Sequence, residues 1–131
     1  DDLNNLGLYY QEKGNIDSSV FYLQKAVGTD TSFFSAWFNM GNSYAQKNDF
    51  QNAISCFSKA ADINPLSEDA WNNIGNSYAA MKDYPNALKN FQKALDLNPA
   101  NPKALNNMGV TFYMLGDTSK ANDYFRKAGR K

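Results

Sequence analysis

Asparagine is the side chain in this sequence whose type and spacing best suit binding chemistry. Eighteen asparagines occur among the 131 residues, and four of them, Asn5, Asn39, Asn73 and Asn107, stand thirty-four positions apart. A carboxamide carries two N–H donors and a carbonyl acceptor, so it can bind both the C=O and the N–H of a peptide bond. The spacing therefore predicts a row of amides that holds the backbone of an extended peptide without reading its side chains.

Other residue types exclude several kinds of chemistry. The sequence has no histidine and one cysteine, Cys56. Without histidine, the Ser-His and Cys-His nucleophile pairs and the common zinc sites cannot form, and a lone thiol makes neither an internal disulfide nor a thiolate cluster. We expect a non-catalytic protein with no metal and no cofactor, in which Cys56 is a partly buried, inert thiol.

Charge and hydropathy exclude further classes of partner. Thirteen Lys and Arg balance thirteen Asp and Glu, which argues against a general nucleic-acid or membrane-surface binder. No stretch of about 18 apolar residues predicts a membrane span. The basic cluster at the chain end, Arg126, Lys127, Arg130 and Lys131, has a nucleic-acid interpretation. We favour the alternative that these cations complement the partial negative charge of a helix C-terminus, an effect of about 0.3 to 1 kcal/mol.

A repeat of thirty-four residues organises the elements that must position the amides. Trp37 recurs as Trp71 and Gly41 as Gly75 at this spacing. The other columns pair Tyr44 with Tyr78, Ala53 with Ala87, Phe57 with Phe91, and Pro65 with Pro99. The same register continues outward in both directions, which divides the chain into four repeats: 1–33, 34–67, 68–101 and 102–131.

Each repeat is predicted to be a pair of helices. In the second repeat, apolar residues at i, i+3, i+4 and i+7 predict helices over 34–47 and 50–61, with a polar turn between them. Gly41 lies inside the first helix, where glycine costs about 1 kcal/mol relative to alanine, so we expect a close helix crossing there. Ala53 and Ala60 are expected to supply the matching small surfaces on the second helix, so that the bulky side chains of Trp37, Tyr44 and Phe57 can pack around the crossing.

Proline and polar residues predict where helices end and begin. Pro65 and Pro99 are expected to end the second helices of the two central repeats. Ser67 and Asn101 are suitable N-caps for the helices that follow, and Pro102 is tolerated just inside the second of these.

The columns of the second repeat, Ala36-Trp37, Met40-Gly41, Tyr44, Ala53, Phe57, Ala60 and Pro65, resemble the tetratricopeptide repeat. The resemblance covers the whole chain and implies an all-α, right-handed superhelical solenoid of four helix-turn-helix units, with the first helices on the inner wall. We expect one array over 1–131, as a piece of a longer protein because the sequence starts with Asp1-Asp2. A residue two positions beyond the tryptophan column points about 200° away from it, toward that wall.

The resemblance also implies a function, which is to bind an extended peptide segment of a partner protein. Similar arrays in O-linked N-acetylglucosamine transferases and peroxisomal import receptors hold peptides with rows of asparagines. The predicted groove residues are Phe38, Asn39, Asn42, Asn73, Asn76, Lys103 and Asn107. The alternative is that asparagine is simply frequent in this chain and in such repeats.

Chaperone adaptors of this family bind a C-terminal carboxylate with basic residues and asparagines, and this chain matches their clamp only in part. Asn42, Asn73 and Lys103 match the clamp, but Phe38 stands where lysine is needed and Asn107 where a basic residue is usual. Lys103 alone would lose much of the charge-assisted bonding. We therefore expect an apolar anchor at Phe38 or Tyr113 in place of a carboxylate clamp.

Two further functions are left open. Repeat 4 ends without the polar helix that commonly seals such arrays, so Phe125 and its neighbours are expected to face solvent. The uncovered ends of repeats 1 and 4 are expected to pack on other copies, as a homo-oligomer, or on the rest of the chain. In the other alternative, the array is the substrate-presenting region of a larger enzyme such as a glycosyltransferase.

Overall fold

The computed structural model describes residues 1–129, which form eight α-helices and no strand. The helices are α1 (Asp2–Glu12), α2 (Ile16–Thr29), α3 (Phe34–Gln46), α4 (Phe50–Ile63), α5 (Glu68–Ala80), α6 (Tyr84–Leu97), α7 (Pro102–Met114) and α8 (Thr118–Lys127). The predicted all-α class is confirmed, and the helices of the second repeat end within two residues of their predicted bounds. The right-handed superhelix stays a prediction.

Polar side chains begin almost every described helix. All helices except α3 have an N-cap whose side chain accepts a backbone N–H from the first turn. Ser67 and Asn101 act in this way, as predicted, and Pro102 is the first residue of α7. Such a cap contributes about 1 kcal/mol, so the sequence fixes the helix starts locally.

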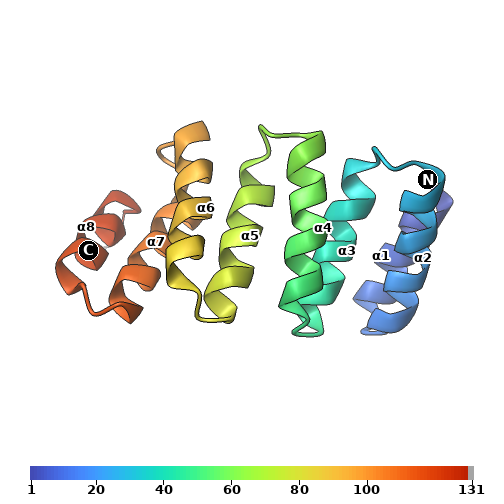
Figure 1. Cartoon of the computed structure of the whole chain (residues 1–131), viewed down its shortest axis with the longest axis horizontal. Coiled ribbons are helices and arrows are strands. Elements are labelled where there is room, and N and C mark those ends of the chain that lie inside the picture. Colours follow the sequence, from blue (N-terminus) through green and yellow to red (C-terminus); the bar gives the residue numbers. More distant parts are fainter. Residues whose placement is uncertain (130–131) are drawn as a thin grey trace. The chain divides into compact units, whose positions relative to one another are not determined.

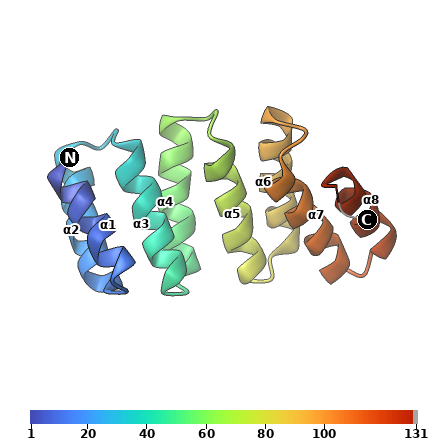
Figure 2. The same cartoon turned by 180° about the vertical axis from the view of Figure 1, so that it is seen from behind.

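The chain divides into two compact units, Asp1–Pro65 and Leu66–Lys131, each holding two repeats. Figure 1 shows α1–α4 of the N-terminal unit in blue to green and α5–α8 of the C-terminal unit in yellow-green to red, and Figure 2 shows the same helices from behind. In the N-terminal unit, α3 packs on both α1 and α2, and in the C-terminal unit α7 packs on α5 and α6. Each unit therefore buries its own core.

The two cores use equivalent positions of the repeat. The N-terminal core contains Leu23, Ala26, Val27, Ala36, Met40 and Cys56, with Trp37 and Tyr44 packed against it. The C-terminal core contains Ala87, Phe91, Ala94, Leu95, Ala104, Leu105 and Met108, with Trp71 and Tyr78 packed against it. The aromatic columns thus serve packing, as their spacing predicts.

The close helix crossing at the glycine column is confirmed, and an aromatic ring of the second helix fills it. A Cβ atom added to Gly41 would stand 2.7 Å from Cδ1 of Phe57, and one added to Gly75 would stand 2.5 Å from Cδ1 of Phe91. Large rings from the second helix therefore lie on the glycines. Ala53 and Ala60 of the second helix are fully buried, and Phe57 packs at the crossing, as expected, because the missing glycine side chain leaves room for its ring.

A similar contact changes the expectation for the C-terminal end. Phe125 is half-buried, and its ring lies against Gly109, so the prediction that it faces solvent was wrong. The large apolar side chains exposed on α7 and just after it are Val110, Tyr113, Met114 and Leu115.

None of the helices among residues 1–129 combines the length and apolar character of a membrane span. The same residues contain no cluster of three or more Cys, Asp or Glu side chains that could hold a metal ion.

Candidate functional site

Two of the four periodic asparagines form amide pairs between neighbouring first helices. Nδ2 of Asn39 on α3 donates a hydrogen bond to Oδ1 of Asn4 on α1, at 3.0 Å. Nδ2 of Asn107 on α7 donates in the same way to Oδ1 of Asn72 on α5, also at 3.0 Å. Each hydrogen bond uses one of the two N–H groups of the donor asparagine. The second N–H group and the Oδ1 atom of that asparagine take no part in the pair.

The acceptor asparagines were missed in the sequence analysis. Asn4 and Asn72 are buried, with 8% and 4% of their surface exposed. Each precedes a member of the periodic row and stands at the same position of its repeat, which is the signal that could have revealed them. Repeat 2 has Phe38 at the acceptor position, so it cannot supply the acceptor of a third amide pair.

The other predicted amides are more accessible. Asn5 on α1 and Asn76 on α5 are exposed, while Asn42 on α3 and Asn73 on α5 are half-buried. The backbone carbonyl of Asn73 accepts a hydrogen bond from the Ser77 hydroxyl, and its side chain forms no amide pair of the kind seen at Asn39. The row is therefore not a uniform ladder, because its members differ in exposure and in hydrogen bonding.

Phe38 and Lys103 have different surroundings. The half-buried ring of Phe38 stacks on Phe34, with ring centroids 5.7 Å apart. It also makes a T-shaped contact with Phe57, with ring centroids 5.6 Å apart. Lys103 is exposed in the first turn of α7. The structure thus groups Phe38, Asn39 and Asn42 in the N-terminal unit, and Asn73, Asn76, Lys103 and Asn107 in the C-terminal unit.

Asn106 on α7 stands at the repeat position of Asn4 and Asn72, but its Oδ1 atom is buried with no hydrogen-bond partner among residues 1–129. In the two amide pairs, this atom accepts from an asparagine on the first helix of the next repeat. A buried acceptor without a donor costs about 1 to 3 kcal/mol, so Asn106 marks a position where a donor is expected.

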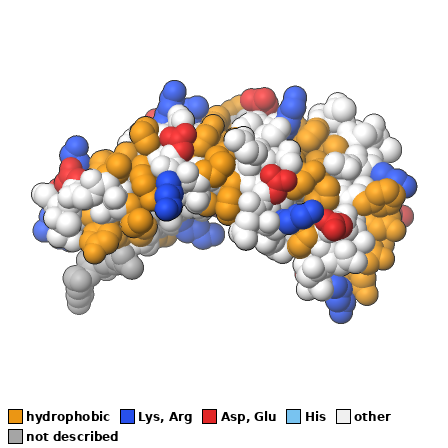
Figure 3. All heavy atoms as spheres, turned by 60° about the horizontal axis from the view of Figure 1, so that its bottom comes forward, with side chains coloured by type: hydrophobic (Ala, Val, Ile, Leu, Met, Phe, Trp, Pro, Cys, Tyr) orange, Lys and Arg blue, Asp and Glu red, His pale blue; other side chains and the backbone are white. Residues whose placement is uncertain are grey.

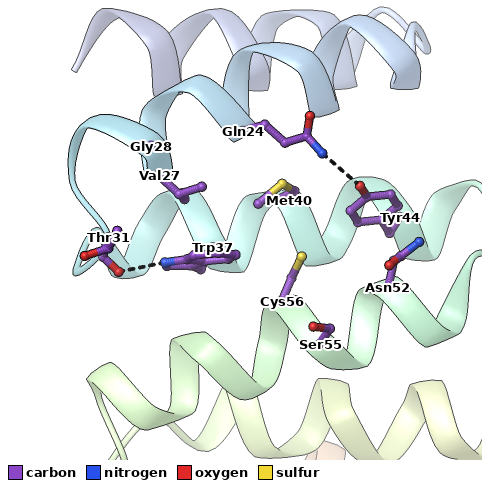
Figure 4. Close-up of a pocket in the computed structure, with 10 residues that line it drawn as sticks. All are labelled: Gln24, Val27, Gly28, Thr31, Trp37, Met40, Tyr44, Asn52, Ser55 and Cys56. Atoms are coloured by element: carbon purple, nitrogen blue, oxygen red, sulfur yellow. Dashed lines mark hydrogen bonds between the residues drawn. The ribbon is translucent and has the colours of Figure 1, made fainter.

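A pocket of about 430 Å³ lies in the N-terminal unit between α2 and α4, with α3 as its floor (Figure 4). Its lining consists of Gln24, Val27, Gly28, Thr31, Trp37, Met40, Tyr44, Asn52, Ser55 and Cys56. The indole Nε1 of Trp37 donates to the Thr31 carbonyl oxygen at 2.9 Å, and Nε2 of Gln24 donates to the Tyr44 hydroxyl at 3.4 Å (Figure 4). Sequence reasoning missed this pocket.

Burial sets the chemistry of the two titratable groups in this pocket. It raises the pKa of the Cys56 thiol to about 12, and the negative charge of Asp49 adds to the effect. Burial also raises the pKa of the Tyr44 hydroxyl. Both groups are therefore neutral at physiological pH, and the expectation of an inert Cys56 agrees with its buried position.

The C-terminal unit has a pocket of about 380 Å³ at the same place in the repeat. Its lining consists of Gln92, Leu95, Asp96, Pro99, Leu105, Tyr124 and Lys127. Most of these residues stand two repeats after a residue of the first pocket, and Tyr124 takes the place of Cys56. The recurrence shows that the repeat geometry creates these pockets.

Charged side chains are scattered on the face drawn in Figure 3, where single basic and acidic groups lie between apolar areas. Lys47 pairs with Asp17 at 2.7 Å, and Arg126 pairs with Asp123. Arg126 and Lys127 lie in the last turn of α8, as the helix-end interpretation requires, while Arg130 and Lys131 lie outside the described residues.

Comparisons with known proteins agree with this architecture. Models described as tetratricopeptide repeat match residues 3–32, 34–65 and 103–131, and a model described as TPR repeat matches residues 75–116. The comparison with curated proteins finds no match.

Solved structures of MamA are similar in fold. One crystal structure of MamA has a TM-score of 0.90 and 26% sequence identity, covering 96% of this chain and 74% of that one. MamA 41-end from Desulfovibrio magneticus RS-1 has a TM-score of 0.89 and 20% identity, covering 96% and 71%. With repeat matches along its length and an all-α repeat fold, this chain belongs to the tetratricopeptide repeat family, as a protein-interaction or scaffold module.

Proposed function

We propose that this chain binds an extended segment of a partner protein on the surface of its first helices, through side-chain amides. The observation that carries the proposal is the series of half-buried and exposed asparagines on α1, α3, α5 and α7. In the C-terminal unit this surface comprises Asn73, Asn76, Lys103 and Asn107. In the N-terminal unit it comprises Phe38, Asn39 and Asn42.

The amide pairs support this function because they orient part of the row before a ligand arrives. Asn39 and Asn107 are each held by one hydrogen bond, to Asn4 and Asn72. A side chain that is already ordered loses less conformational entropy on binding. Its remaining N–H and its Oδ1 can then serve a peptide bond at a lower entropic cost than those of a mobile amide.

The proposed role is to bind and present a segment, and it includes no catalytic step. A larger enzyme that carries such an array for substrate presentation would use the same surface in the same way. The first helices therefore have one proposed task in either setting.

The test uses peptides selected on the chain from a display library of unstructured sequences. Two amides that each contribute about 0.5 to 1.5 kcal/mol predict a loss of roughly 5-fold to 150-fold in affinity for the double variant Asn73→Ala/Asn76→Ala. Calorimetric titration with a selected peptide measures it. Asn122→Ala, an exposed asparagine on α8, is the matched control and should bind as the parent does. If no selected peptide binds the double variant more weakly, the amide surface is not the binding site.

Asn106 favours a second function, which is head-to-tail assembly of this chain. Asn5 on α1 stands at the same repeat position as the donors Asn39 and Asn107, and its side chain is exposed. The described residues contain no repeat before it that could supply an acceptor. If α1 of a second copy packed beside α7, Asn5 would lie next to Asn106 as Asn39 lies next to Asn4, and the Asn106 amide would have to turn outward to accept from it. The exposed side chains of Val110, Tyr113 and Met114 would be covered by the same contact.

In this head-to-tail arrangement, the charges on α1 of one copy and on α8 of the other are complementary. Ala36, at the start of α3, packs in a core with Ala26 and Val27 from the last turn of α2. Asp2 holds the position of Ala36 on α1, so it would approach the last turn of α8 in the other copy. Among the described helices, α8 alone has basic residues in its last turn, Arg126 and Lys127.

Sedimentation velocity over a range of concentrations tests the assembly. We expect a series of growing species, because a head-to-tail contact does not close on itself. Asp2→Lys or Lys127→Asp should weaken the assembly, and a mixture that pairs the two reversed charges should restore it. Asn106→Ala should weaken it without lowering the stability of the monomer. Asp62→Lys on α4 is the control, and a monomer at all concentrations would exclude this function.

A further inference from the structure

Aromatic stacking inside the repeat shows which kind of side chain the N-terminal pocket lacks. In repeat 1, Tyr10 of the first helix stacks on Tyr22 of the second, with centroids 5.4 Å apart and planes within 7°. In repeat 4, Phe112 stacks on Tyr124 at 5.6 Å and 14°. These pairs occupy identical positions of the repeat, so the geometry of the helix pair accommodates two parallel rings.

Repeat 2 keeps the first ring and lacks the second. Tyr44 stands at the position of Tyr10 and Phe112, but Cys56 stands where repeats 1 and 4 have tyrosine. Repeat 3 has Asn90 at this position. Tyr44 and Cys56 both line the pocket between α2 and α4 (Figure 4). The tyrosine ring thus faces a cavity at the place where its counterparts face another ring.

Neighbouring substitutions keep this cavity open. Gly28 stands at the position of Asp96, and nothing lies within 4 Å of the point where its Cβ would be. In the C-terminal unit, Asp96 binds Gln92 at 3.0 Å. In the N-terminal unit, the equivalent Gln24 reaches across to the hydroxyl of Tyr44.

The size and lining of the cavity fit one aromatic ring with a polar group. An apolar cavity of roughly 150 Å³ accepts benzene, so about 430 Å³ has room for a phenol ring and for the chain that carries it. Trp37, Met40 and Val27 supply apolar surface. Gln24, Asn52 and Ser55 supply hydrogen-bonding groups around it.

We propose that this pocket binds an aromatic side chain of a partner protein, a tyrosine by preference, whose ring stacks on Tyr44 in the place that Tyr22 and Tyr124 occupy in their own repeats. Offset stacking of two rings adds to the benefit of burying them. The pocket lies between second helices, so this interaction is separate from the proposed amide surface on the first helices. A partner that uses both would bind two faces of the same chain.

N-acetyl-L-tyrosinamide serves as the probe in an NMR titration of the isotope-labelled chain, and N-acetyl-L-leucinamide serves as the apolar control. We expect saturable shifts at Tyr44, Cys56 and the Trp37 indole with the tyrosine compound, and contacts between its ring protons and the Tyr44 ring. The leucine compound should bind at least 5-fold more weakly. Equal affinity for the two compounds, or no saturable shift, would overturn the proposal.

Variants separate filling of the pocket from other effects. Cys56→Tyr recreates the internal stack of repeats 1 and 4 and should weaken tyrosinamide binding at least 10-fold, while Cys56→Ser should leave it within 2-fold. Tyr44→Leu, which keeps apolar volume but removes the ring, gives an independent measurement if Cys56→Tyr does not fold. With Tyr44→Leu, the tyrosine compound should bind no better than the leucine compound. Undiminished tyrosinamide binding by a folded Cys56→Tyr chain would show that the ring binds elsewhere.

Discussion

Single residues decide how closely the paired helices approach. Gly41 and Gly28 are both helical glycines, but only Gly41 has a ring above it. Substituting two glycines that look equivalent in the sequence should therefore have opposite effects on stability, depending on what lies within 4 Å of the added Cβ atom.

Replacing each glycine with alanine should show this contrast. Gly41→Ala places a Cβ atom 2.7 Å from the Phe57 ring, so we expect the free energy of unfolding to fall by about 1 to 3 kcal/mol. Gly28→Ala meets open space and gains helix propensity, so we expect a rise of about 0.5 to 1 kcal/mol. Urea unfolding followed by circular dichroism measures both. A Gly41→Ala variant as stable as the parent chain would contradict the close approach of the Phe57 ring to Gly41.

The Cys56 thiol gives a prediction that depends on pH. Its pKa rises from 9.0 to about 12 in the folded chain, so the reactive thiolate is scarce below that pH. We expect the rate of alkylation by iodoacetamide to increase about tenfold per pH unit from pH 8 to pH 11 without levelling off. In the unfolded chain, in guanidinium chloride, the rate should level off just above pH 9. A plateau near pH 9 in the folded chain would contradict a buried, uncharged thiol.

At the scale of the helical elements, the turn inside each repeat requires one residue with left-handed backbone geometry. Gly14, Asn48, Lys82 and Gly116 hold this position in the four repeats, with φ angles of 80°, 63°, 63° and 85°. Lysine is the least suited of these residues, because its Cβ atom disfavours positive φ.

Lys82→Gly should therefore raise the free energy of unfolding by about 1 kcal/mol. The matched control is Lys89→Gly, which changes an exposed lysine inside α6 and should lower stability by about 1 kcal/mol. Thermal unfolding of the two variants beside the parent measures the difference. Equal destabilisation by both would mean that the geometry at Lys82 carries no strain.

At the scale of the whole molecule, each of the two compact units buries a core of its own. In repeat proteins, each repeat is stabilised mainly by its contacts with the adjacent repeats. Damage to one core should therefore remain largely local. Phe57 and Phe91 are equivalent residues of the two units, and each is only 1% exposed, which makes them a matched pair for this test.

Phe91→Ala should lower the stability of the C-terminal unit by about 3 to 5 kcal/mol through the cavity that it leaves. Hydrogen exchange should then accelerate in α5–α8, while α1 and α2 keep their protection. Phe57→Ala should give the reverse pattern, with faster exchange in α1–α4 and continued protection in α7. Uniform loss of protection in both variants would show that the chain unfolds as one unit.

The sequence by itself determined the repeat, the helices and their ends. The period of thirty-four residues, the apolar spacing in 34–47 and the caps Ser67 and Asn101 are local features, and local features are sufficient to define a helix and where it starts. The glycine column also predicted a close crossing correctly, because glycine inside a helix needs a compensating contact. The sequence does not say that the Phe57 ring lies directly on Gly41, because that contact depends on the distance between the two packed helices.

Only the tertiary structure decided how the predicted site residues are used. The bonds from Asn39 to Asn4 and from Asn107 to Asn72 join residues 35 positions apart, so they depend on how neighbouring first helices pack. The same packing leaves Asn106 without a donor and opens a pocket beside Cys56. Spacing along a helix gives the direction of a side chain, but the distance to a neighbouring helix, which decides between a free amide and a paired one, comes from the packed core.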